Sequence, residues 1–292
     1  MAYRAFYALQ GLSTRDHQPT NALFGFIRMV RQLEKQWRPD RLVVTFDGGA
    51  PAHRLEKCPA YKAQRPPMPA DLRSQLALID EFLAAAGIPM VLLQGQEADD
   101  VMATLAARAA AAGATVRLAT SDKDLMQLVD ERIRIVPPTK TEEEMGPAGV
   151  AAKTGVQPAQ IVDWLALVGD TADNIPGIDG IGPKTATKLI AQFGSLDACL
   201  AQAEQIESAG LRAKVQAGRD IARLNVALMT LDKDVPGVPD WAAIPPPAPD
   251  FAKLKAFFEK YELHKFAAEL AAQAPAPPPA PPRPADGQMS LF

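Results

Sequence analysis

Hydrophobic positions in the first half of the chain follow two periods. Apolar residues recur at helical spacing in four segments, residues 1–10, 21–37, 71–86 and 98–112. Four shorter apolar runs have the composition of buried strands, residues 42–47, 89–94, 115–120 and 132–136. Strands that alternate with helices are typical of a parallel sheet with helices packed on it. The pattern predicts an α/β domain over residues 1–150.

The second half carries helical patterns and no run of strands. Residues 160–168 and 183–193 read as two helices on either side of a glycine-rich segment, and a further helical stretch covers residues 251–272. We therefore expect a helical domain over residues 151–272. Seven prolines between 275 and 284 then predict an extended, semi-rigid spacer within a disordered tail over residues 273–292.

Three carboxylates are crowded into Gln94-Gly-Gln-Glu-Ala-Asp-Asp-Val101, directly after the second strand run. Two unit charges about 4 Å apart repel by roughly 4 kcal/mol at an effective dielectric constant near 20, so such crowding requires cations. Oxygen ligands suit hard ions such as Mg²⁺ or Mn²⁺. The alternative is the first turn of a helix, where acidic side chains meet the helix dipole favourably.

The other strand runs also end on acidic residues. In an open parallel sheet, ligands bind beyond the carboxyl ends of the strands, so these side chains should share one edge. We name this edge the acidic rim; it comprises Asp47, Glu97, Asp99, Asp100, Asp122 and Asp124. Each one taken alone could be a turn residue or a helix cap. Together they predict a metal site, to which Asp170 and Asp173 add a second pair unless they cap a loop.

A basic connector follows Asp47. Residues 53–65 carry four basic side chains and one aromatic ring, followed by prolines that prevent a continuous helix: Arg54, Lys57, Lys62, Arg65 and Tyr61. A basic segment beside an acidic metal rim suits a substrate that bears phosphates, and Tyr61 could stack on a base. The alternative is a solvated surface loop.

The glycine-rich segment, residues 169–186, has a more specific pattern than a single pair of glycines. Gly177, Gly180 and Gly182 permit close approach of another backbone, and Pro183 is suited to the first position of a helix. Exposed amides at a helix start bind phosphate without reading bases. Lys184 and Lys188 add positive charge one helical turn apart.

Composition narrows the possible classes of protein. The net charge is −3, so binding of nucleic acid would depend on local basic patches. Cys58 and Cys199 have no disulfide or metal-ligand spacing, which favours a reducing cytoplasm. The N-terminus lacks the apolar region of a signal peptide, and no apolar run is long enough to span a membrane.

The chain ends on Gln288-Met-Ser-Leu-Phe292. Two apolar anchors at the tip of a proline-rich tether are typical of a peptide that a partner recognises. A frayed terminus is normally polar, and this ending is not.

These segments together resemble the bacterial 5′→3′ exonuclease and flap endonuclease family, which includes the N-terminal nuclease domain of DNA polymerase I. The resemblance rests on residues 3–9, 18–21, 43–47, 61–62, 97–100, 121–124 and 169–186 and covers nearly all of residues 2–270. It implies a PIN-like α/β nuclease domain with a basic arch at about residues 53–75, followed by a helix–three-turn–helix DNA-binding domain. It also implies a stand-alone, monomeric, metal-dependent nuclease that cuts DNA at 5′ flaps and branched or nicked duplexes in replication and repair.

The resemblance also assigns roles to residues. One Mg²⁺ or Mn²⁺ would be held by Asp47, Glu97, Asp99 and Asp100, and a second by Asp122, Asp124, Asp170 and Asp173. Lys62 and Arg54 would stabilise the scissile phosphate, and Tyr61 would stack on the terminal base beside Arg65. The duplex backbone would be bound, often with K⁺, by Gly177, Gly180, Gly182, Lys184, Thr185 and Lys188. The last five residues resemble the bacterial sliding-clamp peptide, with Gln288, Leu291 and Phe292 as anchors.

One feature of the family pattern is absent. Family members carry an aspartate on a strand, of the type Leu-Leu-Val-Asp-Gly, about ten residues before the Tyr-Arg-Ala-Phe segment, whereas here Met1 stands directly before the segment that begins at Tyr3. We expect the true start to lie upstream; the other interpretation is a lost ligand and an impaired site. The alternative functions are a branched-DNA-binding protein that does not cut and a ribonuclease of related fold.

Overall fold

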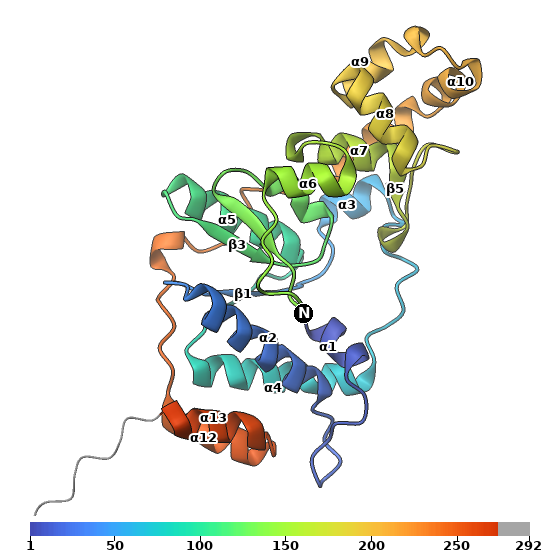
Figure 1. Cartoon of the computed structure of the whole chain (residues 1–292). Helices are drawn as coiled ribbons and strands as arrows, with labels where there is room; N and C mark the ends of the chain where they lie inside the picture. Colours follow the sequence, from blue (N-terminus) through green and yellow to red (C-terminus); the bar gives the residue numbers. More distant parts are fainter. Residues whose placement is uncertain (274–292) are drawn as a thin grey trace, which may run out of the picture.

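The computed structural model describes residues 1–273, in which an α/β region is followed by a helical region (Figure 1). The α/β region contains α1 (Ala2–Ala8), α2 (Asn21–Trp37), β1 (Val44–Phe46), α3 (Ala52–Lys57), α4 (Ala70–Ala86), β2 (Met90–Leu92), α5 (Ala98–Ala111), β3 (Val116–Ala119), η1 (Asp124–Leu128) and β4 (Ile133–Val136). All four predicted strands and all four predicted helices of this region are present, and the strands are shorter than expected.

The strands form two parallel pairs, β1 with β2 and β3 with β4. The sequence predicted one parallel sheet, but within residues 1–273 no ladder of hydrogen bonds joins the two pairs. Helix α5 contacts both β1 and β3 and so bridges the pairs. Its buried face, which includes Val101 and Leu105, packs on Val91 of β2. Ala103 and Ala106 of the same helix pack in the core that contains Leu118 of β3, so α5 contributes to the cores of both pairs.

The basic connector begins with a short helix, α3, where the sequence had predicted a loop. Prolines confine this helix to six residues, because Pro51 stands at its N-cap and Pro59 follows its end. The chain then runs through turns to α4, which begins at Ala70 within the segment expected to form the arch.

The helical region contains α6 (Pro147–Thr154), η2 (Pro158–Gln160), α7 (Ile161–Val168), β5 (Gly169–Asp170), η3 (Thr171–Asp173), β6 (Ile175–Pro176), α8 (Pro183–Phe193), α9 (Leu196–Ala201), η4 (Ala203–Gln205), α10 (Ala209–Ala217) and α11 (Arg219–Met229). Helix α7 is buried against α8 and α11. The hydrophobic core of this region continues into β3, β4 and η1, so the two regions are packed on each other.

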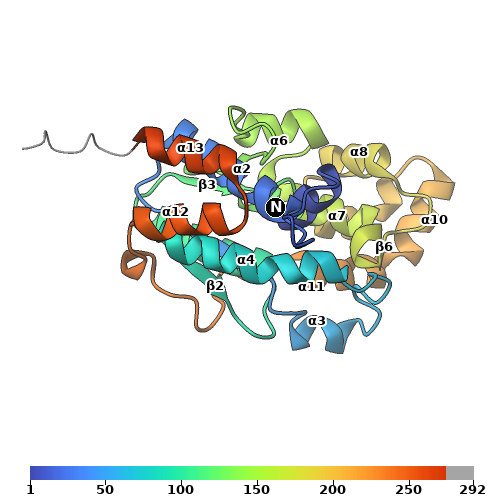
Figure 2. The same ribbon diagram turned by 90° about the horizontal axis from the view of Figure 1, so that it is seen from below.

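The chain then returns to the α/β region through η5 (Trp241–Ala243). It ends on α12 (Phe251–Lys260) and α13 (His264–Gln273). Phe258 of α12 is fully buried in a core that α2 and α4 also line. The predicted helical stretch is two helices because Glu262 adopts a left-handed backbone conformation, with φ of 54°. Figures 1 and 2 place α12 and α13 at the opposite end of the molecule from α8 and α10.

The fold class expected from the sequence is confirmed: an α/β region precedes a helical region. None of the helices within residues 1–273 is both long and apolar enough to cross a bilayer. The tail and its terminal peptide, including Gln288, Leu291 and Phe292, lie outside the described residues.

Candidate metal and nucleic-acid site

The predicted acidic residues lie just beyond the carboxyl ends of β1, β2 and β3 or on the segment that follows α7. Three of them come into close contact: Asp124, Asp170 and Asp173 each offer a carboxylate oxygen within 4.8 Å of the others. They are brought together by η1 at the end of the third strand run and by η3 after α7. Residues almost fifty positions apart in the sequence therefore form one cluster of oxygen ligands.

Asp124 is the least satisfied member of this cluster. Its buried Oδ1 has no hydrogen-bond partner among the described residues. Burial first, and then the Asp122 and Asp170 carboxylates, raise the pKa of Asp124 to about 8. An unpartnered buried carboxylate oxygen among other carboxylates is what a bound cation would satisfy. The donor set, oxygen only, fits Mg²⁺ or Mn²⁺.

Asp99 and Asp122 extend this acidic region. Burial raises the pKa of Asp99 to about 7, and the Asp122 carboxylate adds to this effect. Asp122 is exposed, and its Oδ1 accepts a hydrogen bond from the backbone N–H of Asp124 at 3.0 Å. Asp47 is also exposed and accepts a hydrogen bond from Gly49 N–H at 2.9 Å. Asp47 is outside the group whose oxygens gather within 4.8 Å.

Glu97 occupies the middle of a buried set of charged side chains. It accepts hydrogen bonds from Arg54 and Lys62, and from the Tyr61 hydroxyl at 3.1 and 3.2 Å. Lys62 Nζ also lies 3.4 Å from Asp173 Oδ2 and so bridges Glu97 and the three-aspartate cluster. The ammonium group of Lys62 thus neutralises carboxylates from both predicted ion sites.

The base of the arch is docked on the segment that follows α7. Backbone N–H of Lys62 donates to Asp173 O at 3.0 Å, and Asn174 Nδ2 donates to Ala60 O at 2.7 Å. Arg65 donates to Asp173 Oδ1 at 2.5 Å. Lys62 adopts a left-handed backbone conformation with φ of 56°, which these contacts hold in place. Arch and helical region therefore meet at the acidic cluster.

Arg54 and Tyr61 are placed differently from what the sequence suggested. Arg54 is only 1% exposed and uses its guanidinium within the protein, so it cannot reach a phosphate in this arrangement. Tyr61 is 5% exposed and belongs to the hydrophobic core, so its ring has no free face that could stack on a base. Burial first, and then the Glu97 and Asp173 carboxylates, raise the pKa of Tyr61, so its hydroxyl remains a donor.

The glycine-rich segment forms a tight antiparallel turn before α8. Gly169 and Gly177 approach so closely that a Cβ on Gly169 would lie 2.2 Å from Gly177 N. Gly182 caps α8, and the Thr185 N–H donates to Gly182 O at 3.0 Å. Lys184 and Lys188 are exposed on the first turns of α8. Two exposed lysines thus lie next to the exposed end of the glycine turn, at Gly180 and Gly182.

Two protein-family models match the chain. The description of the first is 5′-3′ exonuclease, N-terminal resolvase-like domain, over residues 1–155; that of the second is 5′-3′ exonuclease, C-terminal SAM fold, over residues 156–252. The chain belongs to the 5′-3′ exonuclease family. The boundary between the two models falls at residue 155, close to α6 and η2.

Relatives of this chain include a protein of similar length and much longer ones. It is 40% identical to a 5′-3′ exonuclease of Aquifex aeolicus over 268 residues, which are 92% of this chain and 91% of the relative. It is 39% identical to the thermostable DNA polymerase I of Thermus thermophilus over 288 residues, which are 97% of this chain and 34% of the relative. The chain therefore spans about a third of the length of the DNA polymerase I relatives that it matches.

Solved structures share the fold of this chain. The T5 5′-exonuclease with bound divalent metal ions (zinc) aligns with a TM-score of 0.66 at 22% identity and covers 93% of this chain and 95% of its own. The catalytic core of Rad2 in complex with DNA substrate aligns with a TM-score of 0.57 at 18% identity, over 90% of this chain and 86% of its own.

Two lysines of the site were not assigned from the sequence. Lys123 lies between two predicted ligands, and its Nζ is 3.3 Å from Asp170 Oδ1. Its place inside Ser121-Asp-Lys-Asp124 was a signal that could have identified it. Lys214 of α10 brings its Nζ so close to the glycine turn that a Cβ on Gly180 would lie 1.9 Å from it. No local pattern connects Lys214 to a turn some thirty residues earlier.

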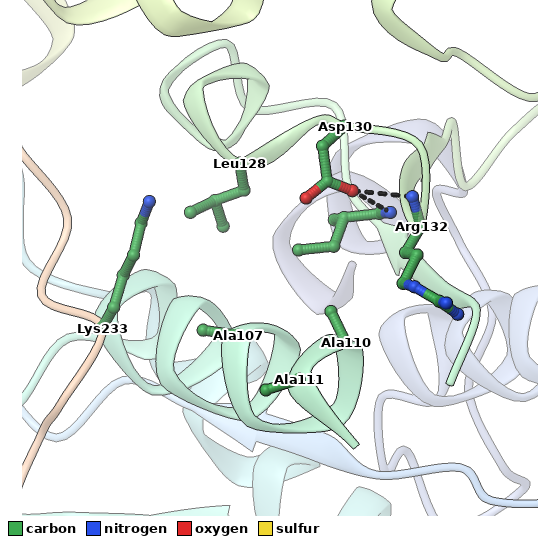
Figure 3. A pocket seen from close by; sticks show the side chains of 8 residues that line it. Ala107, Ala110, Ala111, Leu128, Asp130, Arg132 and Lys233 are labelled. Atoms are coloured by element: carbon green, nitrogen blue, oxygen red, sulfur yellow. Dashed lines mark hydrogen bonds between the residues drawn. The ribbon is translucent and has the colours of Figure 1, made fainter. Parts of the chain in front are cut away.

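The cavity in Figure 3 lies elsewhere. It has a volume of about 370 Å³ and is lined mainly by alanines of α5 and by side chains near the start of β4, including Asp130 and Arg132. Asp130 accepts hydrogen bonds from Arg132 N–H at 2.7 Å and Ile133 N–H at 2.8 Å, so its carboxylate is already satisfied. The cavity opens at the amino end of β4, whereas the acidic rim lies beyond the carboxyl ends of the strands.

Proposed function

We propose that this chain is a divalent-metal-dependent 5′ nuclease that hydrolyses DNA phosphodiester bonds at 5′ flaps and at branched or nicked duplexes. The observation that carries the proposal is the cluster of Asp124, Asp170 and Asp173, with the unpartnered buried Oδ1 of Asp124. The relatives named 5′-3′ exonuclease, at about 40% identity over nearly the whole chain, support it. Replication and repair are the processes in which such a nuclease would act.

The residues present fit a pair of Mg²⁺ or Mn²⁺ ions. Asp124, Asp170 and Asp173, together with Asp122, would hold one, and Asp99 and Glu97, with Asp47, would hold the other. When bound, two such ions supply an activated water and stabilise charge on the leaving oxygen.

Lys62 and Arg65 have a defined part in this proposal. They now neutralise Glu97 and Asp173. Cations bound at the carboxylates would release these two side chains toward a phosphate at the same place. A lysine or guanidinium beside the scissile group stabilises the charge that develops there.

The duplex portion of the substrate would be bound by the glycine turn and α8. Gly177, Gly180 and Gly182 would supply backbone amides near a helix start, Thr185 would supply its hydroxyl, and Lys184 and Lys188 would supply charge, so binding would depend on the phosphate backbone and on salt. We include a K⁺ ion at this turn in the proposal. Flap affinity in K⁺ compared with the same concentration of a larger monovalent cation tests that part.

The decisive experiment uses a labelled 5′-flap oligonucleotide and Mg²⁺. We expect the wild-type chain to cut near the junction and Asp124→Asn to lower kcat at least about 100-fold, while it still binds the flap. Asp80→Asn, an exposed carboxylate on α4, is the matched control and should cut like wild type. Flap binding without cleavage by the wild type would favour a branched-DNA binder, and faster cleavage of single-stranded RNA would favour a ribonuclease.

We also propose that Gln288, Leu291 and Phe292 bind the bacterial sliding clamp and that the protein acts as a cytoplasmic monomer. The terminal peptide sequence Gln-Met-Ser-Leu-Phe after a proline-rich stretch supports the first part. Removal of the last five residues should abolish clamp capture and leave cleavage of short oligonucleotides unchanged. Retained capture by the shortened chain would overturn the assignment. Light scattering of the purified chain measures the oligomeric state.

A further inference from the structure

The adjacent carboxylates Asp99 and Asp100 are in opposite situations, although both stand in the first turn of α5. Asp99 is partly exposed, and the Asp122 carboxylate of the acidic rim acts on it electrostatically. Asp100 is 0% exposed. Successive residues of a helix point about 100° apart, so two neighbours cannot serve the same surface equally.

The oxygens of Asp100 are already occupied. Its Oδ1 accepts hydrogen bonds from Arg54 Nη2 at 2.8 Å and from Asp232 N–H at 2.9 Å, and its Oδ2 accepts one from Arg54 Nη1 at 2.5 Å. A carboxylate has about four lone-pair positions, so three of them are used. The guanidinium contacts both oxygens of Asp100, and it would repel a divalent ion bound at the same carboxylate.

Arg54 connects three separate segments through these contacts. From α3, at the start of the arch, its Nε donates to Leu228 O at 2.9 Å and its Nη2 donates to Thr230 O at 3.1 Å. Its remaining contacts are with Glu97 and Asp100 at the start of α5. A planar guanidinium that makes a two-point contact with a carboxylate fixes orientation as well as distance.

The same face of α5 continues this attachment. We name residues 228–238, which lead out of α11, the return segment. Thr104 Oγ1 donates to Asp232 O at 3.2 Å and accepts from Val235 N–H at 3.1 Å, and Arg108 Nη1 donates to Val238 O at 2.6 Å. Asp100, Thr104 and Arg108 are four residues apart and so form one stripe along the helix. The return segment is held along this stripe from end to end.

We propose that Arg54 is a positioning residue and that Asp100 is its structural acceptor, not a metal ligand. Through this pair, the start of the arch and the end of the helical region are fixed relative to the acidic rim. The inference rests on the proposed nuclease function and refines it, since it removes Asp100 from the predicted ligands and Arg54 from the residues that touch phosphate.

The test measures divalent-ion binding without DNA and without turnover, by calorimetry with Mn²⁺ and with Ca²⁺. We expect Asp99→Asn to lower Mn²⁺ affinity at least about 10-fold and Asp100→Asn to change it less than about 3-fold. Amide hydrogen exchange supplies the second readout. Asp100→Asn should accelerate exchange within residues 230–235 at least about 10-fold, because the Asp232 amide loses its charged acceptor, and Asp99→Asn should not.

Equal loss of Mn²⁺ affinity in Asp99→Asn and Asp100→Asn would overturn the inference. If Asp100→Asn does not fold, the same measurements on Arg54→Lys test the inference. The positioning role predicts unchanged Mn²⁺ affinity, faster exchange in residues 230–235 and a lower kcat with unchanged flap affinity. If Asp100 were instead a metal ligand that Arg54 masks, Arg54→Lys should bind Mn²⁺ more tightly than wild type. Absence of any divalent-ion binding by the wild type would instead contradict the proposed function.

Discussion

At the scale of single residues, the carboxylates of the site differ in the cations and hydrogen-bond donors that lie next to each of them. Glu97 and Asp173 are neutralised by Lys62 and Arg65, and Asp170 by Lys123. Within residues 1–273, the buried Oδ1 of Asp124 has no hydrogen-bond partner. Burial and then the Asp122 and Asp170 carboxylates raise the pKa of Asp124 to about 8, so its ionised form is disfavoured until a cation binds. That position is where a bound ion would contribute most.

The raised pKa of Asp124 predicts how stability depends on pH. Its folded-state pKa of about 8 lies above the value near 3.9 of an unfolded aspartate. The folded state thus binds the proton more tightly, and its contribution to stability is present at low pH and lost as pH rises through about 8. In EDTA, wild type should lose stability relative to Asp124→Asn between pH 6 and pH 9, as measured by urea denaturation.

Added Mg²⁺ should oppose that loss in the wild type, because the ion requires the ionised carboxylate. A difference in unfolding free energy between wild type and Asp124→Asn that stays constant from pH 6 to pH 9 would contradict the assigned environment of Asp124.

At the scale of elements, the glycine turn depends on contact between two backbones. A Cβ on Gly177 would lie 2.2 Å from Val168 O, whereas a Cβ on Gly182 would meet nothing within 4 Å. The turn joins the end of α7, which is buried, to the start of α8, which is the proposed phosphate site. Gly177 therefore has no room for a side chain, whereas Gly182 in the same short segment has room for one.

We expect Gly177→Ala to lower the free energy of unfolding by about 1–3 kcal/mol, because backbone atoms cannot move aside as a flexible side chain can. Gly182→Ala is the matched control within the same turn, and it should stay within about 0.5 kcal/mol of wild type. Urea denaturation followed by circular dichroism measures both. Equal stability of the two variants would show that the turn is looser than the structure has it.

At the scale of the whole molecule, the last described helices close the α/β region. Phe258 of α12 lies beside Phe82 of α4 and Phe266 of α13, with ring centroids 6.4 and 5.7 Å away. The guanidinium of Arg31 lies 5.6 Å from the centroids of Phe258 and Phe266. Residues more than 200 positions apart thus form one aromatic core at the end of the molecule opposite α8 and α10 (Figure 2).

Loss of this core should affect stability without touching the proposed site. We expect Phe258→Ala to cost about 3–5 kcal/mol of unfolding free energy, as for other large side chains removed from a core. Phe251→Ala, on the same helix but 51% exposed, should cost less than about 0.5 kcal/mol. Thermal and urea denaturation compare the two. A small loss in Phe258→Ala would mean that α12 does not close the core.

The sequence by itself determined the four strands of the α/β region, the helices α1, α2, α4 and α5, and the helices α7 and α8 on either side of the glycine-rich segment. Helical and strand periods are local properties, so the bounds of α2 and α7 agree with the pattern to within a residue. The carboxyl ends of parallel strands meet at one edge, which placed Asp122 and Asp124 beyond the third strand run and pointed to a metal site there. Gly177, Gly180 and Gly182 before Pro183 likewise identified a close backbone turn before a helix.

Only the tertiary structure decided which way side chains face and what they meet. Asp99 and Asp100 are neighbours in sequence, yet one faces the rim and the other a buried guanidinium, because the phase of α5 is set by packing on distant strands. Arg54 and Tyr61 read as solvent-facing in a basic segment, but contacts with α11 and with the core bury them. The residues that bury these side chains or bond to them are distant in the sequence, so the local hydrophobic periodicity does not indicate them.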